Sequence, residues 1–293
     1  MLSRLLAVLL AVAAAGPAAA EKLRVGVGLH PYYSWVTNIV GDRAEVIPVI
    51  PSDVDPHSYQ IRPEDVARLR ALDVVVVNAL GHDEFIEPML AAAGKADIPR
   101  ILPNEGVPQL RDANGTPNSH TFLSITSAVQ QVANISDALG RLDPANAGRY
   151  AAASAEYRKR LRGLLAAAAA RLPQGDLSKI RIATVHDGYS YLLEDLGLKV
   201  AAVIQPRHGI EPSARQLADT VSRLKANGID ILFAEADYGR GFADVVAKET
   251  GARVAKLSHV SAGPYRPDTY ERAMSTNLDV VVEAVRAAYA TRR

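Results

Sequence analysis

The chain has 293 residues, a formal net charge of +1 and no cysteine. The lack of cysteine excludes disulfides, thiolate metal ligands and a lipid-modified N-terminal cysteine. The near-neutral charge argues against nucleic-acid binding, because the one basic cluster, Arg158-Lys159-Arg160, is short and typical of a solvated helix face.

Residues 1–20 have the pattern of a secretory signal peptide. Arg4 is the only charge before Glu21, residues 5–15 are apolar, and Gly16-Pro17 leads to a small-residue cleavage site at 18–20. The apolar run is shorter than the roughly 20 residues that span a bilayer, which favours a cleaved peptide over an anchor. We therefore expect a mature chain that begins at Glu21 and resides, without a lipid anchor, in a Gram-negative periplasm.

Short β-branched runs alternate with amphipathic helical patterns along the rest of the chain. Strands are predicted at 23–29, 44–50, 73–78, 99–102, 180–185, 200–204, 230–234 and 253–257. Helices are predicted at 32–40, 63–71, 84–93, 125–139, 189–196, 212–227, 241–249 and 267–289. This alternation predicts an α/β protein with two similar lobes, each a parallel sheet with flanking helices.

One long helix is predicted between the two halves. Asp143 suits the N-cap, Pro144 the first helical position, and Pro173 ends the pattern. About 29 residues would give a rod of roughly 43 Å. The expected organisation is an N-terminal lobe at 21–141, a rigid linking helix at 142–173 and a C-terminal lobe at 174–293, with a nearly preformed cleft between the lobes.

Four of the seven histidines follow a predicted strand or lead into a helix, where open α/β sheets bind ligands. These are His57, His120, His186 and His259, two from each half. Imidazole nitrogen suits zinc, and a tetrahedral site of such ligands needs no thiolate. The pattern predicts a metal site between the lobes.

At these residues the chain resembles the solute-binding proteins of manganese and zinc ABC importers, over essentially the whole mature sequence. The resemblance rests on Asp55-Pro56-His57 with Tyr59 and Pro63, on Ser119-His120-Thr121, on His186-Asp187 before Tyr189 and Tyr191, on residues 209–213, and on a late helix with Asn277. It implies two α/β lobes, a rigid connecting helix, one metal in the interlobe cleft, and delivery to an inner-membrane permease with its ATPase.

The resemblance also bears on the metal. Manganese members carry a carboxylate at the position of His186, so imidazole there favours zinc, one Zn²⁺ per chain. The family usually has aspartate at the position of His259, which leaves His259, a nearby acid or water as the fourth ligand. Zinc members often carry a histidine-rich insertion before the second ligand. In this chain the corresponding stretch, residues 111–118, is short and contains no histidine.

Other polar residues are candidates to hold a ligand imidazole by accepting its second N–H. These are Asp187, Glu211, His30 and His208, with Glu235 a weaker candidate. His208 fits an exposed loop equally well, and His82 is interpreted as a residue of a loop that enters a helix.

The alternatives are a manganese- or iron-binding solute-binding protein of the same family, a zinc hydrolase, a surface adhesin and a storage protein. The sequence contains neither H-E-x-x-H nor G-x-S-x-G, and it has no metal-rich tract. We therefore expect a monomeric transport protein that is not an enzyme. A periplasmic zinc metallochaperone is left open as a further partner.

Overall fold

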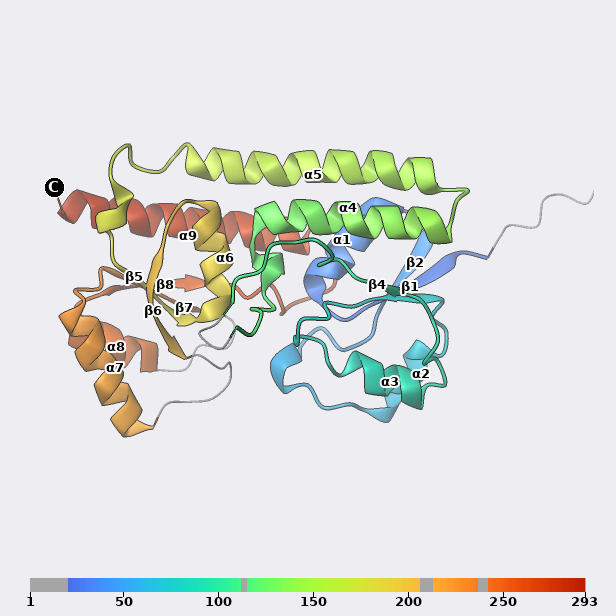
Figure 1. The fold of residues 1–293 in the computed structure, drawn as a ribbon, viewed down its shortest axis with the longest axis horizontal. Helices are drawn as coiled ribbons and strands as arrows, with labels where there is room; N and C mark the ends of the chain where they lie inside the picture. The colour runs from blue at the N-terminus through green and yellow to red at the C-terminus, as the bar shows by residue number, and fades with distance from the viewer. Residues whose placement is uncertain (1–20, 112–114, 206–212, 237–241, 293) are drawn as a thin grey trace, which may run out of the picture.

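The computed structural model describes residues 21–111, 115–205, 213–236 and 242–292 (Figure 1). The predicted signal peptide and two of the candidate site residues, His208 and Glu211, lie outside these ranges.

Two four-stranded parallel sheets form the framework. The first has the order β2-β1-β3-β4, built from β1 (Leu23–Val27), β2 (Ala44–Pro48), β3 (Val74–Val76) and β4 (Arg100–Ile101). The second has the order β6-β5-β7-β8, built from β5 (Ile182–His186), β6 (Val200–Gln205), β7 (Ile231–Glu235) and β8 (Arg253–Leu257). The matching orders and the parallel pairing confirm the predicted fold class.

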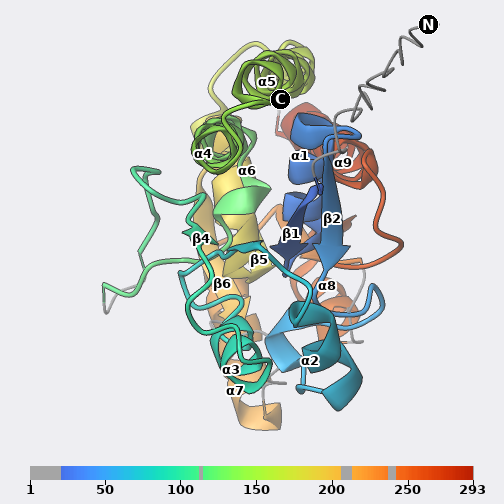
Figure 2. The ribbon, with the colours of Figure 1, turned by 90° about the vertical axis from the view of Figure 1, so that its right-hand side faces the viewer.

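Helices cover both sheets in two layers. The α-helices are α1 (His30–Val40), α2 (Pro63–Leu69), α3 (Ile86–Ala92), α4 (Ile125–Leu142), α5 (Ala147–Ala169), α6 (Ser190–Asp195), α7 (Ala214–Ala226), α8 (Phe242–Thr250) and α9 (Thr269–Thr291). Short 3₁₀ turns are η1 (Pro56–Ser58), η2 (Thr121–Leu123), η3 (Leu177–Lys179) and η4 (Asp187–Tyr189). The long helices α4, α5 and α9 run lengthwise along one side, whereas α2–α3 and α7–α8 lie on the other (Figures 1 and 2).

The linking helix begins later than the sequence predicts. Asp143 and Pro144 do not start a helix; they form the turn that follows α4, and α5 begins at Ala147 after Asn146. The Asp143 carboxylate accepts hydrogen bonds from Asn146 Nδ2 at 2.8 Å and Tyr150 OH at 2.7 Å. It therefore stabilises the α4–α5 turn instead of capping the first N–H groups of a helix. At its other end α5 stops at Ala169, four residues before Pro173.

Alternating strand residues divide the interior into layers, as the period-2 geometry of a strand requires. In β3, Val74 and Val76 face one side of the sheet, while Val75 lies on the other. In β7, Ile231 and Phe233 face one side and Leu232 the other. The first set in each sheet joins residues of α1, α4, α5 and α9 in a single cluster, here called the shared core. The second sets form two smaller clusters, one beneath α2–α3 and one beneath α7–α8.

Direct contacts also cross from the first half of the chain to the second. His30 Nε2 lies 2.8 Å from the Gly263 carbonyl, and Tyr270 OH donates to the Phe122 carbonyl at 2.9 Å. The Trp35 and Tyr270 rings meet edge to face with centroids 5.0 Å apart. The two sheets are thereby held in one fixed relation around the shared core.

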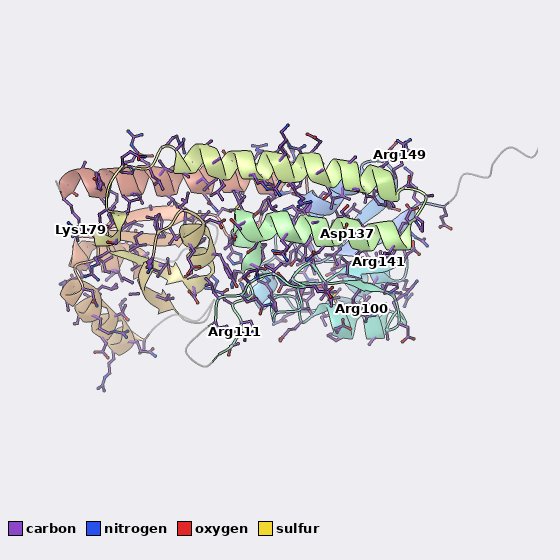
Figure 3. The ribbon with its side chains drawn as sticks, turned by 45° about the horizontal axis from the view of Figure 1, so that its top comes forward. Arg100, Arg111, Asp137, Arg141, Arg149 and Lys179 are labelled. Carbon is purple, nitrogen blue, oxygen red and sulfur yellow. The ribbon has the colours of Figure 1, made fainter. Side chains whose placement is uncertain are left out.

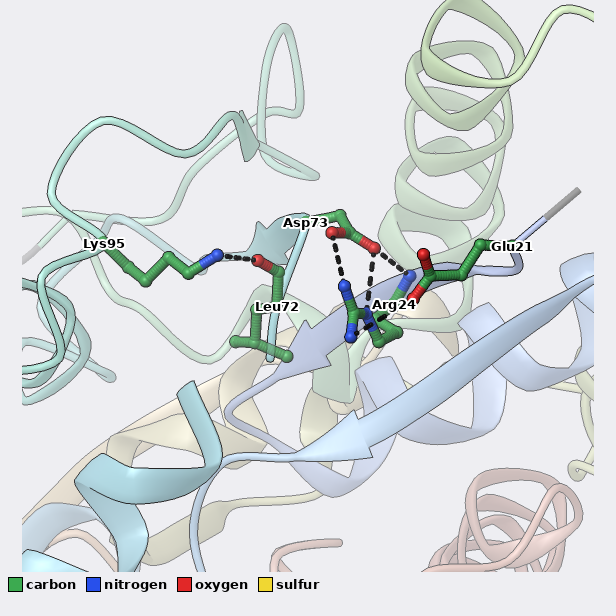
Figure 4. Close-up of polar contacts among 5 residues, drawn as sticks. All are labelled: Glu21, Arg24, Leu72, Asp73 and Lys95. Carbon is green, nitrogen blue, oxygen red and sulfur yellow. Dashed lines mark hydrogen bonds and ion pairs between the residues drawn. The ribbon is translucent and has the colours of Figure 1, made fainter. Parts of the chain in front are cut away.

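An aspartate fastens the amino end of the first sheet (Figure 4). Asp73, just before β3, accepts hydrogen bonds from the Arg24 backbone N–H at 2.8 Å and from its Nε at 3.2 Å. In the second sheet Asp230 accepts from the Arg181 backbone N–H at 2.7 Å in the same way. Both sheets are therefore anchored at their amino ends, which leaves the loops at the carboxyl ends to form a site.

The outer surface is charged. Asp137 and Arg141 on α4 and Arg149 at the start of α5 are exposed (Figure 3). Among the described residues, no helix combines the length and the apolar character needed to cross a membrane.

Candidate metal centre

Five histidines gather where the carboxyl ends of the two sheets face each other. His57 lies in η1 after β2, His186 ends β5, and His259 follows β8. His82 lies in the loop after β3, and His120 directly precedes η2. Because both sheets are parallel, their strand-end loops meet in one place, as in other open α/β folds.

Their donor atoms form two overlapping sets. In the first set, donor atoms of His57, His82, His120 and His259 all lie within 4.8 Å of one another. In the second, the same limit holds for His186, Glu235 and His259. The first three histidines come from the first half of the chain and the other members from the second. The cluster therefore joins the two halves, and His259 belongs to both sets.

His120 lies at the centre of the cluster. Its Nδ1 is 2.8 Å from Asn118 Oδ1, which can only accept, so Nδ1 carries the proton and Nε2 bears the lone pair. That Nε2 lies 3.2 Å from His57 Nε2 and 2.9 Å from His186 Nε2. Three imidazole nitrogens thus converge on one point, with Asn118 in the orienting role that metal-binding histidines usually require.

Backbone contacts hold the other histidines. The Asp55 carboxylate accepts from the His57 N–H at 3.0 Å. Asn277 on α9 binds both backbone groups of Ser258, at 2.8 and 2.9 Å, one residue before His259. His259 Nδ1 itself lies 3.0 Å from Ser261 Oγ. These contacts preset the positions of the rings.

Backbone strain concentrates at the same loops. Among the described residues, the non-glycine residues with positive φ are Ala79 at 58° and Val260 at 59°. Such conformations cost on the order of 1–3 kcal/mol each and persist where the surroundings impose them. Ala79 lies three residues before His82, and Val260 directly follows His259. The strained backbone therefore lies in the two loops that position these rings.

Gly188 leaves room for the rings. A Cβ at this position would lie 3.0 Å from His120 Cγ and 3.1 Å from His186 Cδ2. Only a residue without a side chain allows η4 to approach the two imidazoles this closely.

Burial keeps His82 and His120 neutral. His82 and His120 are 3% and 6% exposed. Desolvation lowers the pKa of both rings well below the usual value, and the neighbouring histidines lower each pKa further. Neutral imidazole is the form that ligates a metal, so the site is ready for a cation at neutral pH.

The structure brings all four predicted ligands together and adds His82, which is predicted from the sequence to be a loop residue. Of the predicted orienting residues, Asp187 accepts from Ser190 Oγ at 2.7 Å, and the His30 ring stacks on Tyr265 at 4.2 Å. Asn118 and Gly188 were not predicted. Their roles depend on contacts between distant segments, whereas His82 follows a strand just as His57 does.

Comparisons with known proteins identify the family. The family model of ZnuA, the periplasmic component A of a zinc-uptake complex, matches residues 25–284. The high-affinity zinc uptake protein ZnuA of Bacillus subtilis is 25% identical over 252 residues, covering 81% of this chain and 78% of that protein. The iron-binding protein YfeA of Yersinia pestis is 25% identical over 276 residues, covering 90% and 86%.

Among solved structures, the solute-binding protein FpvC of Pseudomonas aeruginosa in complex with Mn²⁺ is 47% identical, with a TM-score of 0.88. The match covers 92% of this chain and 100% of that one. A further structure of FpvC holds Ni²⁺. The chain belongs to the ZnuA family of metal-binding periplasmic solute-binding proteins, whose members are substrate-binding components of zinc, manganese and iron ABC transporters.

Proposed function

We propose that this protein captures one zinc ion per chain in the periplasm and delivers it to an inner-membrane ABC importer for high-affinity uptake. His57, His120, His186 and His259 bind the ion. The observation that carries the proposal is the convergence of His57 Nε2 and His186 Nε2 on His120 Nε2, at 3.2 and 2.9 Å, from opposite halves of the chain.

The donor chemistry supports zinc. Every predicted ligand is an imidazole, a borderline donor that suits zinc, copper, iron and nickel better than manganese. The residue at the end of β5 is His186, whereas manganese relatives are expected to have a carboxylate there.

A manganese or iron carrier is the second candidate. FpvC is described with Mn²⁺ and Ni²⁺, and YfeA is named as an iron-binding protein. Glu235 offers an oxygen within 4.8 Å of donor atoms of His186 and His259, which is the donor type that manganese prefers.

The remaining features of the proposal concern processing and partners. Residues 1–20 act as a signal peptide, and the mature chain consists of the lobes 21–141 and 174–293 joined by the segment 142–173. The partner is a permease with its ATPase, with a zinc metallochaperone as an open addition. A hydrolytic role is disfavoured, because four histidines can fill a tetrahedral zinc site, whereas a catalytic zinc keeps a position open for water.

Metal competition on the purified mature chain tests this function. Native mass spectrometry should show one zinc, and isothermal titration should give a higher affinity for Zn²⁺ than for Mn²⁺ or Fe²⁺. His57→Ala and His186→Ala should each lower zinc affinity by more than the roughly 10–100-fold typical of residues that only orient a ligand. Stoichiometric Mn²⁺ that zinc does not displace would refute the zinc assignment and favour the second candidate.

A further inference from the structure

His82 is buried in the cluster without a hydrogen-bond partner for either ring nitrogen. The residue is 3% exposed, and both Nδ1 and Nε2 are sealed from solvent and unpaired within the described structure. A neutral imidazole carries one donor and one acceptor, and buried polar atoms are almost always satisfied. Because burying two unpaired ring nitrogens costs free energy, we expect the ring to bind a ligand.

The loop that carries His82 is built to hold the ring in place. The buried Asp83 carboxylate accepts from the Asn78 N–H at 2.6 Å and from the Ala79 N–H at 3.3 Å. Asn78 Nδ2 in turn donates to Tyr32 OH at 2.9 Å. This network imposes the positive φ of Ala79, at 58°. His82 therefore lies, as predicted, in the loop that enters a helix, and that loop contains a hydrogen-bonded, strained turn.

The turn aims the ring at the other imidazoles. The His82 ring centroid lies 4.3 Å from that of His57, 5.0 Å from His120 and 5.6 Å from His259. Its donor atom falls within the same 4.8 Å limit as theirs. Phe122 packs against the same ring at 5.0 Å and lies 5.8 Å from the rings of His120 and His259. Because Phe122 is apolar, the imidazoles of the cluster are the metal-binding groups beside which the His82 ring can bind an ion.

We propose that His82 is a direct ligand of the captured ion in the donor set that it forms with His57, His120 and His259, and that His186, from the second donor set, joins them when the metal binds, so that the coordination number exceeds four. The inference rests on the proposed function and changes the number of ligands that hold the captured ion. It departs from the tetrahedral site of four histidines that the sequence predicts.

The spacing of the nitrogens supports a higher coordination number. With metal–nitrogen bonds of about 2.1 Å, neighbouring donors lie about 3.4 Å apart in a tetrahedron and about 3.0 Å apart at right angles. Of the two Nε2 separations around His120, the one to His186 is 2.9 Å, near the right-angled value, and the one to His57 is 3.2 Å, midway between the two values. A site of this kind suits six-coordinate ions such as Fe²⁺, Co²⁺ and Ni²⁺ as well as zinc, and it selects zinc less sharply than a tetrahedral site.

Cobalt serves as the probe, because its visible spectrum is intense in four-coordinate sites and weak in five- or six-coordinate ones. Co²⁺ bound to the wild-type mature chain should give a weak spectrum. A crystal structure of the same complex should place a His82 ring nitrogen about 2.1 Å from the metal. An intense four-coordinate spectrum, or a His82 ring turned away from the bound metal, would overturn the inference, and both readouts need only the wild-type protein.

Variants add an independent measurement. His82→Phe retains a ring against Phe122 and should lower Co²⁺ and Zn²⁺ affinity at least tenfold, with His82→Ala as a second variant if the phenylalanine is not accommodated. The matched control is Gln131→Leu on α4, a buried residue whose unpaired polar side chain lies outside both donor sets and whose replacement should leave the cobalt spectrum unchanged. Wild-type affinity in a folded His82 variant would contradict direct ligation while leaving the proposed function intact. Failure of wild-type protein to bind any of these metals would instead refute the proposed function.

Discussion

Replacing Gly188 by alanine introduces one methyl group between two of the predicted metal ligands. The built Cβ lies 3.0 Å from His120 Cγ and 3.1 Å from His186 Cδ2, about 0.5 Å inside an ordinary carbon contact of about 3.5 Å. Either both rings or η4 must shift by a similar amount. Changes that disturb the orientation of metal ligands typically cost 10–100-fold in affinity. We therefore expect metal binding to weaken by about 1.4–2.8 kcal/mol, at 1.4 kcal/mol per tenfold.

The assay is a competition titration of Zn²⁺ and Co²⁺ against a chelator, with the melting temperature of the metal-free protein measured in parallel. Gly163→Ala in α5 is the control, because its built Cβ meets no atom within 4 Å. That variant should stabilise the protein by up to about 1 kcal/mol and leave affinity unchanged. If Gly188→Ala binds zinc within twofold of the wild type, the close packing of η4 against the rings is irrelevant to binding and the reasoning fails.

Three further outcomes are expected. Asn118→Ala removes the acceptor of the His120 Nδ1 proton and should lower zinc affinity about 10–100-fold in the same titration, and an unchanged affinity would show that Asn118 does not orient the ring. Burial lowers the pKa of His82 and His120 in the folded metal-free protein, so below about pH 6.5 the unfolded chain binds more protons and the free energy of unfolding falls. Melting curves of the metal-free protein should accordingly shift to lower temperature between pH 7.5 and 5.5, by less in His82→Phe, and a shift of equal size in that variant would argue against this cause. Zinc at about 1,000 times its dissociation constant should stabilise the folded protein by about 4 kcal/mol, and scanning calorimetry that shows no rise in melting temperature would mark the site as adventitious.

The predicted ligands could be found from sequence because strand ends are visible there. His57, His186 and His259 each follow a β-branched run, and parallel strands carry their carboxyl ends to a common edge. The chemistry of the four histidines and the parallel fold class follow from local patterns of this kind.

Features that depend on distant contacts could not be predicted. The turn that orients His82 needs Tyr32 to hold Asn78, 46 residues away. The need for glycine at position 188 arises only when η4 meets His120. Asp143 shows the limit at a helix boundary, because an Asp-Pro pair suits both an N-cap and the turn after a helix. Here the hydrogen bonds that the Asp143 carboxylate accepts from Asn146 and Tyr150 stabilise the turn.

The shared core implies that this molecule consists of an inner part common to both lobes and of two separately packed outer layers. Residues of both sheets and of α1, α4, α5 and α9 pack in one cluster, so disrupting either sheet exposes apolar surface of the other. That part should unfold as a single cooperative unit, in which amide protons exchange only through global opening.

The layer of α2 and α3 packs through a separate, smaller cluster, and it adjoins the loops of His57 and His82. Tyr59, two residues after His57, meets Phe85, three residues after His82, at 4.9 Å. Because this cluster is smaller, we expect that opening this layer costs less free energy than separating the lobes. An ion is then expected to enter or leave through a local opening of this layer, while the long helices remain folded.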